Sequence, residues 1–407
     1  MKVIFPFSYY YPEQCAGIFV VDDLMHRLVE EGDECVIHVP TPTRNVRDGV
    51  KWSRKEILFD GRMVVNRFRM YKEGKNPIFR AFRYCLCELV YMRHLLWDDY
   101  DVAFIDSTPP IQGLKLPIVR LFRKCPVVYN AQDLFPDTLS GTGLARRGGL
   151  LWKIGSWVSR ITFNNSDKII CISEDIRRTL VEEKGVSPEK VEVVYNWVNE
   201  DAVVPVAKND NPLFEELNID RDKFHVVYAG NLGNAQNINV IIDAAKELAG
   251  EKNIEFLIFG TGGLKSSFEE RVKNYGIDNV RFFPLQPIER VSLVYGLGDV
   301  CVVSCKPGLG GAAMPSKMLS IMSAGRAVIA SFDRGELTYI LEQNKCGLFA
   351  PAGDVMAFVN LIMYLASNSE ECRIMGENAR QLILRKFTRD YGTRRYADII
   401  RKVAKNV

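Results

Sequence analysis

The chain has 407 residues, 47% of them hydrophobic and 25% charged, which is an ordinary globular composition. This length exceeds one typical core, so we expect two or three domains. The net charge of +3 is too small to indicate nucleic acid as a partner. No apolar run approaches the ~18 to 20 residues that span a bilayer, and the first residues resemble a buried strand rather than a signal peptide, so we expect a cytoplasmic protein.

Cysteine and histidine usage argues against disulfides and metal sites. The ten cysteines are spread along the chain within apolar runs, as Cys171 is, which predicts reduced and buried thiols. The four histidines show no zinc-binding spacing with the cysteines; they are His26, His38, His94 and His225. We therefore predict neither a metal site nor a bound cofactor.

Strand-like and helical patterns alternate along the chain, which predicts an α/β fold with parallel sheets covered by helices. In the first half, strands are predicted at residues 3–6, 35–39, 64–68, 102–105, 127–130, 168–172 and 191–195. In the second half they are predicted at residues 224–229, 254–259, 280–283, 299–304, 327–330 and 347–349. Two facing, doubly wound Rossmann-like domains would place both sets of strand ends around one cleft.

The domain boundaries follow from a polar segment between the two halves. Residues 204–223 contain two prolines and no sustained period, so they are the predicted linker between a domain of residues 1–203 and a domain of residues 224–387. Residues 388–407 contain a break and a basic helix. The pattern allows this helix either to cross back and pack on the first domain or to cap the second domain. We assign it to the first domain.

A glycine-rich loop and a helix start follow the strand predicted at residues 299–304. Three glycines within residues 308–311 lie at the carboxyl end of this strand, where open parallel sheets bind ligands. Glycine lets backbone amides approach a ligand, and Pro315, Ser316 and Lys317 begin a helix whose free N–H groups attract anions. The segment predicts a phosphate site; the alternative is an ordinary loop before a buried helix.

Two more glycine turns follow strands of the second half. Gly230 and Gly233 follow one strand, and residues 260–263 (GTGG) follow the next. The second turn fails the dinucleotide fingerprint because Lys265 stands at the position of its third glycine, which argues against NAD. Three glycine-rich strand ends in one sheet favour a nucleotide diphosphate, with Lys317 as its countercharge.

Nine motifs follow one another along the chain. Those of the first half are YYYPEQCAGIFV, NAQDLFPDT, KIICISEDIRRTL and VEVVYNWVN, and those of the second half are AGNLGNAQN, FGTGG, FFPLQP, PSKMLSIMSAGRAVIAS and CGLFAPAGD. In this order they resemble the family 4 glycosyltransferases, which have the GT-B fold, over nearly the whole chain. The combination is most similar to a bacterial L-N-acetylfucosaminyltransferase-like subgroup of surface polysaccharide synthesis.

The resemblance implies a retaining transfer of a sugar from a nucleotide diphosphate, usually UDP, without a metal. The C-terminal domain would bind this donor and the N-terminal domain the acceptor. Many family members have an arginine and a lysine where this chain has Asn231 and Gln236, which leaves more of the charge stabilisation to Lys317. Many also have two glutamates where this chain has Ala312 and Ser320, and the second of these glutamates normally binds the ribose.

The site residues are also carried over from the resemblance. Asp133 and Lys317 are the predicted catalytic residues, with Asp133 orienting the acceptor or the donor sugar; the alternative is a loop aspartate that caps a turn. The predicted acceptor-binding residues are Glu13, Gly17 and Asp133. The predicted donor-binding residues are Gly230, Asn231, Leu232, Gln236, Gly260, Gly262, Leu285, Gly310, Gly311, Pro315, Ser316, Lys317 and Ser320.

Three N-terminal segments combine basic residues with large apolar ones, at residues 75–97, 114–124 and 146–160. Such segments suit contact with anionic lipid; the alternative is ordinary helices whose apolar stripes pack on the sheet. A lipid-linked acceptor, which the resemblance implies, favours lipid contact. We therefore expect a peripheral protein on the inner face of the cell membrane.

Together these expectations describe a glycosyltransferase. It would move an N-acetylated aminosugar or a deoxysugar from a UDP-sugar to a polyprenyl-diphosphate-linked oligosaccharide, in capsule, O-antigen or exopolysaccharide synthesis. The alternatives are a nucleotide-sugar epimerase or hydrolase on the same fold, which the scarcity of histidine disfavours, and a non-catalytic homologue.

Overall fold

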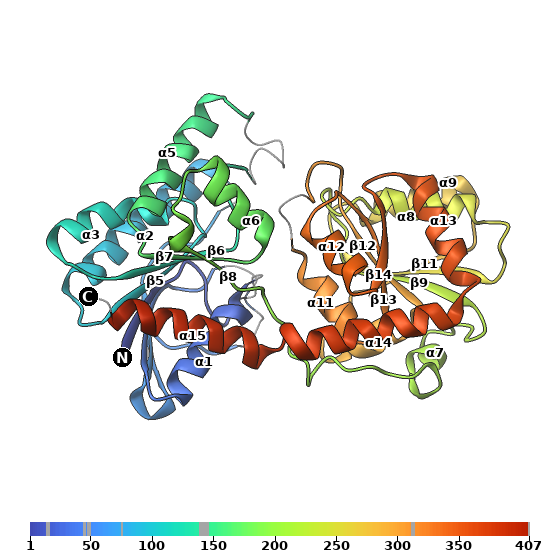
Figure 1. The fold of residues 1–407 in the computed structure, drawn as a ribbon, viewed down its shortest axis with the longest axis horizontal. Helices are drawn as coiled ribbons and strands as arrows, with labels where there is room; N and C mark the ends of the chain where they lie inside the picture. The colour runs from blue at the N-terminus through green and yellow to red at the C-terminus, as the bar shows by residue number, and fades with distance from the viewer. Residues whose placement is uncertain are drawn as a thin grey trace. The chain divides into compact units, whose positions relative to one another are not determined.

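The structure is a computed structural model that describes residues 1–13, 17–43, 46, 50–74, 76–137, 146–310 and 314–405. It divides into two compact units, Met1–Tyr195 with Asp390–Val407, and Asn196–Arg389 (Figure 1). Each unit is built on one mainly parallel sheet with helices between its strands in the sequence. The predicted α/β class, with two Rossmann-like domains, is confirmed.

An eight-stranded sheet forms the centre of the first unit, in the order β3-β4-β2-β1-β5-β6-β7-β8. Only β3 runs antiparallel to its neighbour among the described strands. The central strands are buried on both faces, which explains why their sequences are continuous apolar runs. The strands are β1 (Lys2–Pro6), β2 (Glu34–Pro40), β3 (Lys55–Leu58), β4 (Met63–Phe68), β5 (Val102–Asp106), β6 (Val127–Ala131), β7 (Lys168–Cys171) and β8 (Val191–Val193).

The helices of the first unit begin at recognisable signals. The Asn76 side chain accepts a hydrogen bond from the Ile78 N–H, and a proline follows directly, so α2 begins there. The α-helices of the described residues are α1 (Ile18–Glu30), α2 (Pro77–Trp97), α3 (Leu116–Phe122), α5 (Leu150–Asn164), α6 (Glu174–Arg178) and α15 (Arg389–Lys405). Short 3₁₀ or π turns are η1 (Phe59–Gly61), η2 (Gln112–Lys115), η3 (Thr179–Glu183) and η4 (Pro188–Lys190).

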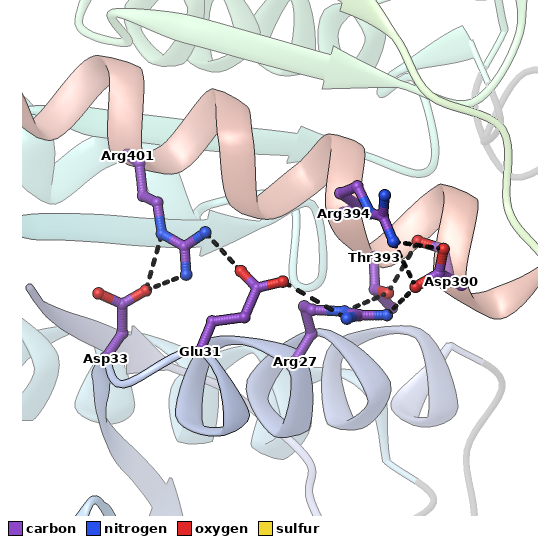
Figure 2. Close-up of polar contacts among 7 residues, drawn as sticks. All are labelled: Arg27, Glu31, Asp33, Asp390, Thr393, Arg394 and Arg401. Carbon is purple, nitrogen blue, oxygen red and sulfur yellow. Dashed lines mark hydrogen bonds and ion pairs between the residues drawn. The ribbon is translucent and has the colours of Figure 1, made fainter.

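The C-terminal helix α15 packs on the first unit although it follows the second unit in the chain. Arg401 lies 2.6 Å from Asp33 and also pairs with Glu31, while Arg27 of α1 pairs with Asp390 (Figure 2). The apolar face of α15 is buried in the same unit. Ion pairs and apolar burial together attach the last helix to the first unit.

A six-stranded parallel sheet forms the centre of the second unit, in the order β11-β10-β9-β12-β13-β14. Its strands are β9 (Phe224–Asn231), β10 (Ile254–Thr261), β11 (Val280–Phe283), β12 (Val300–Ser304), β13 (Ala327–Phe332) and β14 (Gly347–Pro351). Its helices are α7 (Leu213–Glu216), α8 (Ile238–Glu247), α9 (Lys265–Tyr275), α10 (Val291–Gly296), α11 (Ser316–Ser323), α12 (Glu336–Gln343), α13 (Val355–Ala366) and α14 (Ser369–Lys386), with 3₁₀ turns η5 (Lys208–Asp210) and η6 (Ile288–Arg290).

The structure differs from the sequence prediction at two places. Strand β3 was not predicted, because its short, mostly exposed sequence lacks an apolar run. The predicted linker, residues 204–223, is part of the second unit, whose first residue is Asn196. Within that segment Phe214 is buried and Lys208 pairs with Asp299 at 2.8 Å, so its polar composition reflects ion pairs rather than a free linker.

Candidate functional site

The glycine turns of the second unit lie at the carboxyl ends of two adjacent parallel strands. Gly230 at the end of β9 pairs in register with Gly260 of β10, and Asn231 pairs with Thr261. Strand β12 lies on the other side of β9, so the loop that follows β12 starts at the same edge of the sheet. This is the edge at which open parallel sheets bind ligands.

Lys317 lies against this edge, on the first turn of α11. Its Nζ donates a hydrogen bond of 2.8 Å to Oη of Tyr228 and lies 3.9 Å from the centroid of the same ring. Tyr228 Oη in turn donates to the carbonyl oxygen of Asn231 over 2.8 Å. The structure therefore brings Lys317 and the turn after β9 together.

The charge of Lys317 is poorly compensated. Desolvation lowers the pKa of Lys317 to about 7, and no nearby carboxylate of the described residues raises it again. Pro315 is the N-cap of α11 rather than a residue of its first turn, and within the described part of the chain no side chain caps this helix start. A desolvated ammonium beside free helical N–H groups is suited to a diphosphate, whose negative charge would raise the lysine pKa.

Glycine is required at position 230 because the Lys317 side chain lies close to its backbone. Its φ of 147° lies in the region that disfavours side chains. A Cβ atom at this position would lie 2.9 Å from Nζ of Lys317 and 3.6 Å from Oη of Tyr228. Any side chain here would therefore displace the ammonium from the end of β9.

Gly260 and Gly262 serve the packing of the two turns. A Cβ on Gly260 would lie 2.3 Å from the carbonyl oxygen of Gly230, and one on Gly262 would lie 2.4 Å from that of Leu232. Leu232 is buried, and its N–H donates to the carbonyl oxygen of Thr261 over 2.8 Å. These three predicted donor-binding residues hold the turns together, and the Leu232 side chain lies in the core.

Asn231 and Gln236 lie on either side of Gly233. A Cβ on Gly233 would lie 2.8 Å from Nδ2 of Asn231 and 3.0 Å from Oε1 of Gln236. Asn231 is exposed, whereas Oε1 of Gln236 is buried and makes no hydrogen bond to any described residue. Many family members have cations at these two positions. This turn instead has side-chain amides, which can form hydrogen bonds with a ligand.

Gly310, a predicted donor-binding residue, already has a partner for its backbone N–H. Its N–H donates to a carboxylate oxygen of Asp333 over 2.8 Å. The residue is buried, and a Cβ would lie 2.7 Å from the ring of Phe332. Asp333, at the end of β13, thus already accepts the hydrogen bond that this amide can donate. Gly311 lies outside the described residues.

The remaining predicted donor-binding residues lie on two elements. Ser316 is exposed on the first turn of α11, and Ser320 is half-buried one turn further along the same face. Leu285 follows β11 and is 52% exposed, so its side chain is free to contact an apolar part of a ligand. Their contacts with a donor stay predictions.

A polar network occupies the carboxyl ends of β5 and β6 in the first unit. Oδ1 of Asp106 accepts a hydrogen bond of 3.0 Å from Nδ2 of Asn130. Oδ1 of Asn130 accepts from Oη of Tyr396 over 3.0 Å and from Nε2 of Gln132 over 3.1 Å. Because Tyr396 is a buried residue of α15, the C-terminal helix helps to hold the segment that precedes Asp133.

Two carboxyl groups at this edge have raised pKa values. Burial raises the pKa of Asp106 to about 6, and the charge of Asp133 adds to this effect. Desolvation raises the pKa of Asp133 itself, although its side chain is exposed. Asp133 was predicted from the sequence and Asp106 was not, although Asp106 directly follows a predicted strand.

Glu13 and Gly17, the other predicted acceptor-binding residues, lie in the segment between β1 and α1. Glu13 is buried, and its Oε1 accepts a hydrogen bond of 2.8 Å from the N–H of Thr43. It thereby joins the segments that follow β1 and β2. Gly17 is the N-cap of α1 with a φ of 90°, which explains glycine at this position. Contact of either residue with an acceptor stays a prediction.

Two family models match the chain. The model described as Glycosyl transferases group 1 matches residues 209–382, which lie in the second unit. The model described as Glycosyltransferase Family 4 matches residues 19–202, most of which lie in the first unit. Together the two models cover the named strands of both sheets except β1, which precedes the first matched residue.

Several curated relatives are named as glycosyltransferases. The probable glycosyltransferase WbjE of Pseudomonas aeruginosa is 25% identical over 73% of this chain and 72% of its own. The putative colanic acid biosynthesis glycosyl transferase WcaI of Escherichia coli (strain K12) is 32% identical over 53% of each chain. A UDP-Gal:alpha-D-GlcNAc-diphosphoundecaprenol alpha-1,3-galactosyltransferase of Escherichia coli is 23% identical over 57% of this chain and 59% of its own.

Solved structures share the fold at low sequence identity. Sucrose-phosphate synthase from Thermosynechococcus elongatus matches with a TM-score of 0.76 and 18% identity, over 100% of this chain and 99% of its own. Alr3699/HepE of Anabaena, solved in complex with UDP, matches with a TM-score of 0.72 and 14% identity, over 99% of this chain and 100% of its own. These similarities extend over both units.

We expect Gly230→Ala to fold but to displace Lys317. The new Cβ would lie 2.9 Å from Nζ, at the flexible end of the lysine. Strain at the positive φ should lower the free energy of unfolding by about 1–3 kcal/mol, which urea denaturation measures. Loss of a charged hydrogen bond should weaken UDP binding about tenfold or more, which calorimetry measures.

Gly250→Ala, with no atom within 4 Å of its Cβ, is the control. Wild-type UDP affinity in Gly230→Ala would contradict the assignment.

Proposed function

This chain belongs to the family 4 glycosyltransferases and has the GT-B fold, and we propose which reaction it catalyses. Its relatives identify it as a glycosyltransferase of polysaccharide biosynthesis. It transfers an N-acetylated aminosugar or a deoxysugar from a UDP-sugar, with retention of configuration, to a polyprenyl-diphosphate-linked oligosaccharide. The observation that carries this proposal is the desolvated Lys317 ammonium at the end of β9.

Lys317 stabilises the leaving diphosphate in this reaction. The bond between the anomeric carbon and the β-phosphate oxygen breaks, a bond to the acceptor hydroxyl oxygen forms, and the hydroxyl proton leaves with UDP. Negative charge grows on the diphosphate as the bond breaks, so an ammonium fixed at this place lowers the barrier more than it stabilises the ground state. With this cation and the start of α11, the proposed step uses no metal ion.

The first unit supplies the groups that orient the reacting sugars. Asp133 is exposed at the carboxyl end of β6, where it can accept hydrogen bonds from sugar hydroxyls. The network of Asp106, Asn130 and Tyr396 positions the preceding backbone. We assign Asp133 to orientation of the acceptor or the donor sugar, and the network to holding Asp133 in place.

The relatives support the choice of donor and acceptor classes. A structural neighbour was solved with UDP, and one curated relative is named for a UDP-galactose donor and a diphosphoundecaprenol-linked acceptor. A lipid-linked acceptor requires the enzyme to work at a membrane surface. Among the described residues, no helix is both long and apolar enough to cross a bilayer.

The first unit carries a surface suited to lipid, which we call the apolar-basic surface. It is formed by α2, α3 and α5, of which α3 contacts both of the others. Its exposed apolar side chains are Ile78, Phe79, Phe82, Leu89, Trp97, Ile118, Leu121, Phe122, Leu150, Leu151, Ile154 and Trp157. The exposed basic residues on or next to these helices are Arg80, Arg93, Lys124, Arg146, Arg147, Lys153 and Arg160, of which Arg80 and Arg147 also pair with glutamates. Large apolar side chains exposed beside cations favour contact with anionic lipid over packing within the unit.

We expect Lys317→Met to lower the transfer rate by about 100-fold or more and UDP affinity about tenfold or more, because the cation that stabilises the diphosphate is lost. Product formation on a polyprenyl-diphosphate acceptor, followed by mass spectrometry, measures the first effect. Calorimetry with UDP measures the second. Lys246→Met is the matched control, since Lys246 also lies over a tyrosine ring, 4.7 Å from that of Tyr275, and should keep wild-type values.

A donor panel separates this proposal from the other functions. UDP-sugars, but not GDP- or dTDP-sugars, should raise the melting temperature of the protein. Conversion of a nucleotide sugar without an acceptor would indicate an epimerase or hydrolase instead. No response to any nucleotide, or near-normal turnover in Lys317→Met, would contradict the assignment of the donor site.

We expect the protein to bind anionic vesicles in a salt-sensitive way, and the double variant Leu121→Ser, Phe122→Ser to bind at least about tenfold more weakly. These two side chains are 78% and 74% exposed, so their replacement should leave the fold unchanged. Vesicle sedimentation measures the binding. Met356→Ser, an exposed apolar position of the second unit, is the control. Equal sedimentation with neutral and anionic vesicles would contradict the membrane proposal.

A further inference from the structure

A cluster of two histidines and one aspartate in the first unit has no part in the site described above. His38 lies in β2, His94 lies in the last turn of α2, and Asp98 is the C-cap of α2. Oδ2 of Asp98 lies 2.8 Å from Nε2 of His38 and 3.0 Å from Nδ1 of His94. The two imidazole rings are stacked, with 3.7 Å between their centroids. The fold therefore brings one side chain of β2 against two from the end of α2, and all three are of types that bind metals.

The separations within this cluster suit one small cation. One ligand atom from each residue lies within 4.8 Å of the other two. In a tetrahedral zinc site with bonds of about 2.0–2.1 Å, the ligand atoms are about 3.3 Å apart. Two of the separations are shorter than this, and the stacked rings must also turn so that both in-plane lone pairs point at the ion, a change of side-chain rotamers at His94 and His38.

His38 has a buried ring nitrogen that lies close to Asp98 without a well-aligned hydrogen bond. The residue is 3% exposed, and its Nε2 makes no hydrogen bond of acceptable geometry to the described residues, although Asp98 is close. An unsatisfied buried polar atom is unfavourable, and a cation between the ring and the carboxylate would satisfy both.

The backbone fixes the two ligands at the end of α2. The N–H of Asp98 donates to the carbonyl oxygen of His94 over 2.9 Å, and the Asp98 carbonyl accepts a hydrogen bond from the Arg123 guanidinium. The Asp98 side chain is 35% exposed, so solvent and a hydrated ion can reach the carboxylate. The cluster is thus rigid at one end and accessible at the other.

We propose that His38 Nε2, His94 Nδ1 and a carboxylate oxygen of Asp98 bind a divalent transition-metal ion, for which Zn²⁺ is the best match. Two imidazole nitrogens and one carboxylate suit Zn²⁺ better than Mg²⁺ or Ca²⁺, which take oxygen ligands. Water on the exposed side of Asp98 completes the coordination. The bound ion joins the end of α2 to β2 and stabilises the first unit; it is independent of the proposed sugar transfer.

The test titrates the full-length, chelator-treated protein with Zn²⁺ and, separately, with Co²⁺. The titrations use a Cys85→Ser background because Cys85 is an exposed free thiol. We expect a dissociation constant on the order of micromolar or tighter and the visible absorption bands of tetrahedral Co²⁺. His94→Asn and Asp98→Asn should each weaken Zn²⁺ binding by about 100-fold or more. His26→Asn, in the same unit but outside the cluster, should leave it unchanged.

Thermal unfolding gives a second readout that is independent of enzyme activity. Zn²⁺ should raise the melting temperature of the Cys85→Ser protein and of His26→Asn, but not that of Asp98→Asn. Asp98→Asn keeps the size of a partly exposed side chain, so it tests the site even if His94→Asn does not fold. Equal Zn²⁺ affinity in Asp98→Asn and its parent would overturn the proposal and show a hydrogen-bonded histidine–aspartate group instead.

Discussion

Desolvation of the Lys317 ammonium is the constraint on which the proposed donor site depends. The lysine lies over the ring of Tyr228 and donates to its hydroxyl, and desolvation lowers its pKa to about 7. Such a group is stabilised most by an anion that replaces the lost water. The tight packing of Gly230, Gly260 and Gly262 makes room for it at the end of β9. The second unit therefore holds one desolvated amine at the edge of its sheet where we propose that the diphosphate binds.

The C-terminal helix α15 holds part of the first unit in place. Helix α15 is fixed by the ion pairs of Arg401 and Arg27, and it contributes Tyr396 to the network around Asn130. The segment that leads to Asp133 is thus held by a helix that comes last in the sequence. Helix α2 contributes to both the apolar-basic surface and the histidine–aspartate cluster.

Apolar runs and glycine turns made most of the fold and the position of Lys317 predictable. Buried parallel strands have continuous apolar sequences, whereas β3 has an exposed, charged one and escaped prediction. The hydrogen bond from the Gly310 N–H to Asp333, which lies at the end of another strand, could not be predicted from the local pattern. The histidine–aspartate cluster could not be found from spacing, since His38 and His94 meet only when α2 packs beside β2. Contacts between distant segments, rather than local patterns, account for these misses.

Proton uptake on UDP binding tests the central claim most directly. The free protein holds Lys317 at a pKa of about 7, so at pH 8 most of it is neutral. If the diphosphate binds against Lys317, its charge raises that pKa, and calorimetry at pH 8 in buffers of different ionisation enthalpy should detect uptake approaching about one proton per UDP. The uptake should vanish below pH 6 and in Lys317→Arg, whose guanidinium stays charged. UDP binding without proton uptake at pH 8, or equal uptake in Lys317→Arg, would contradict the account.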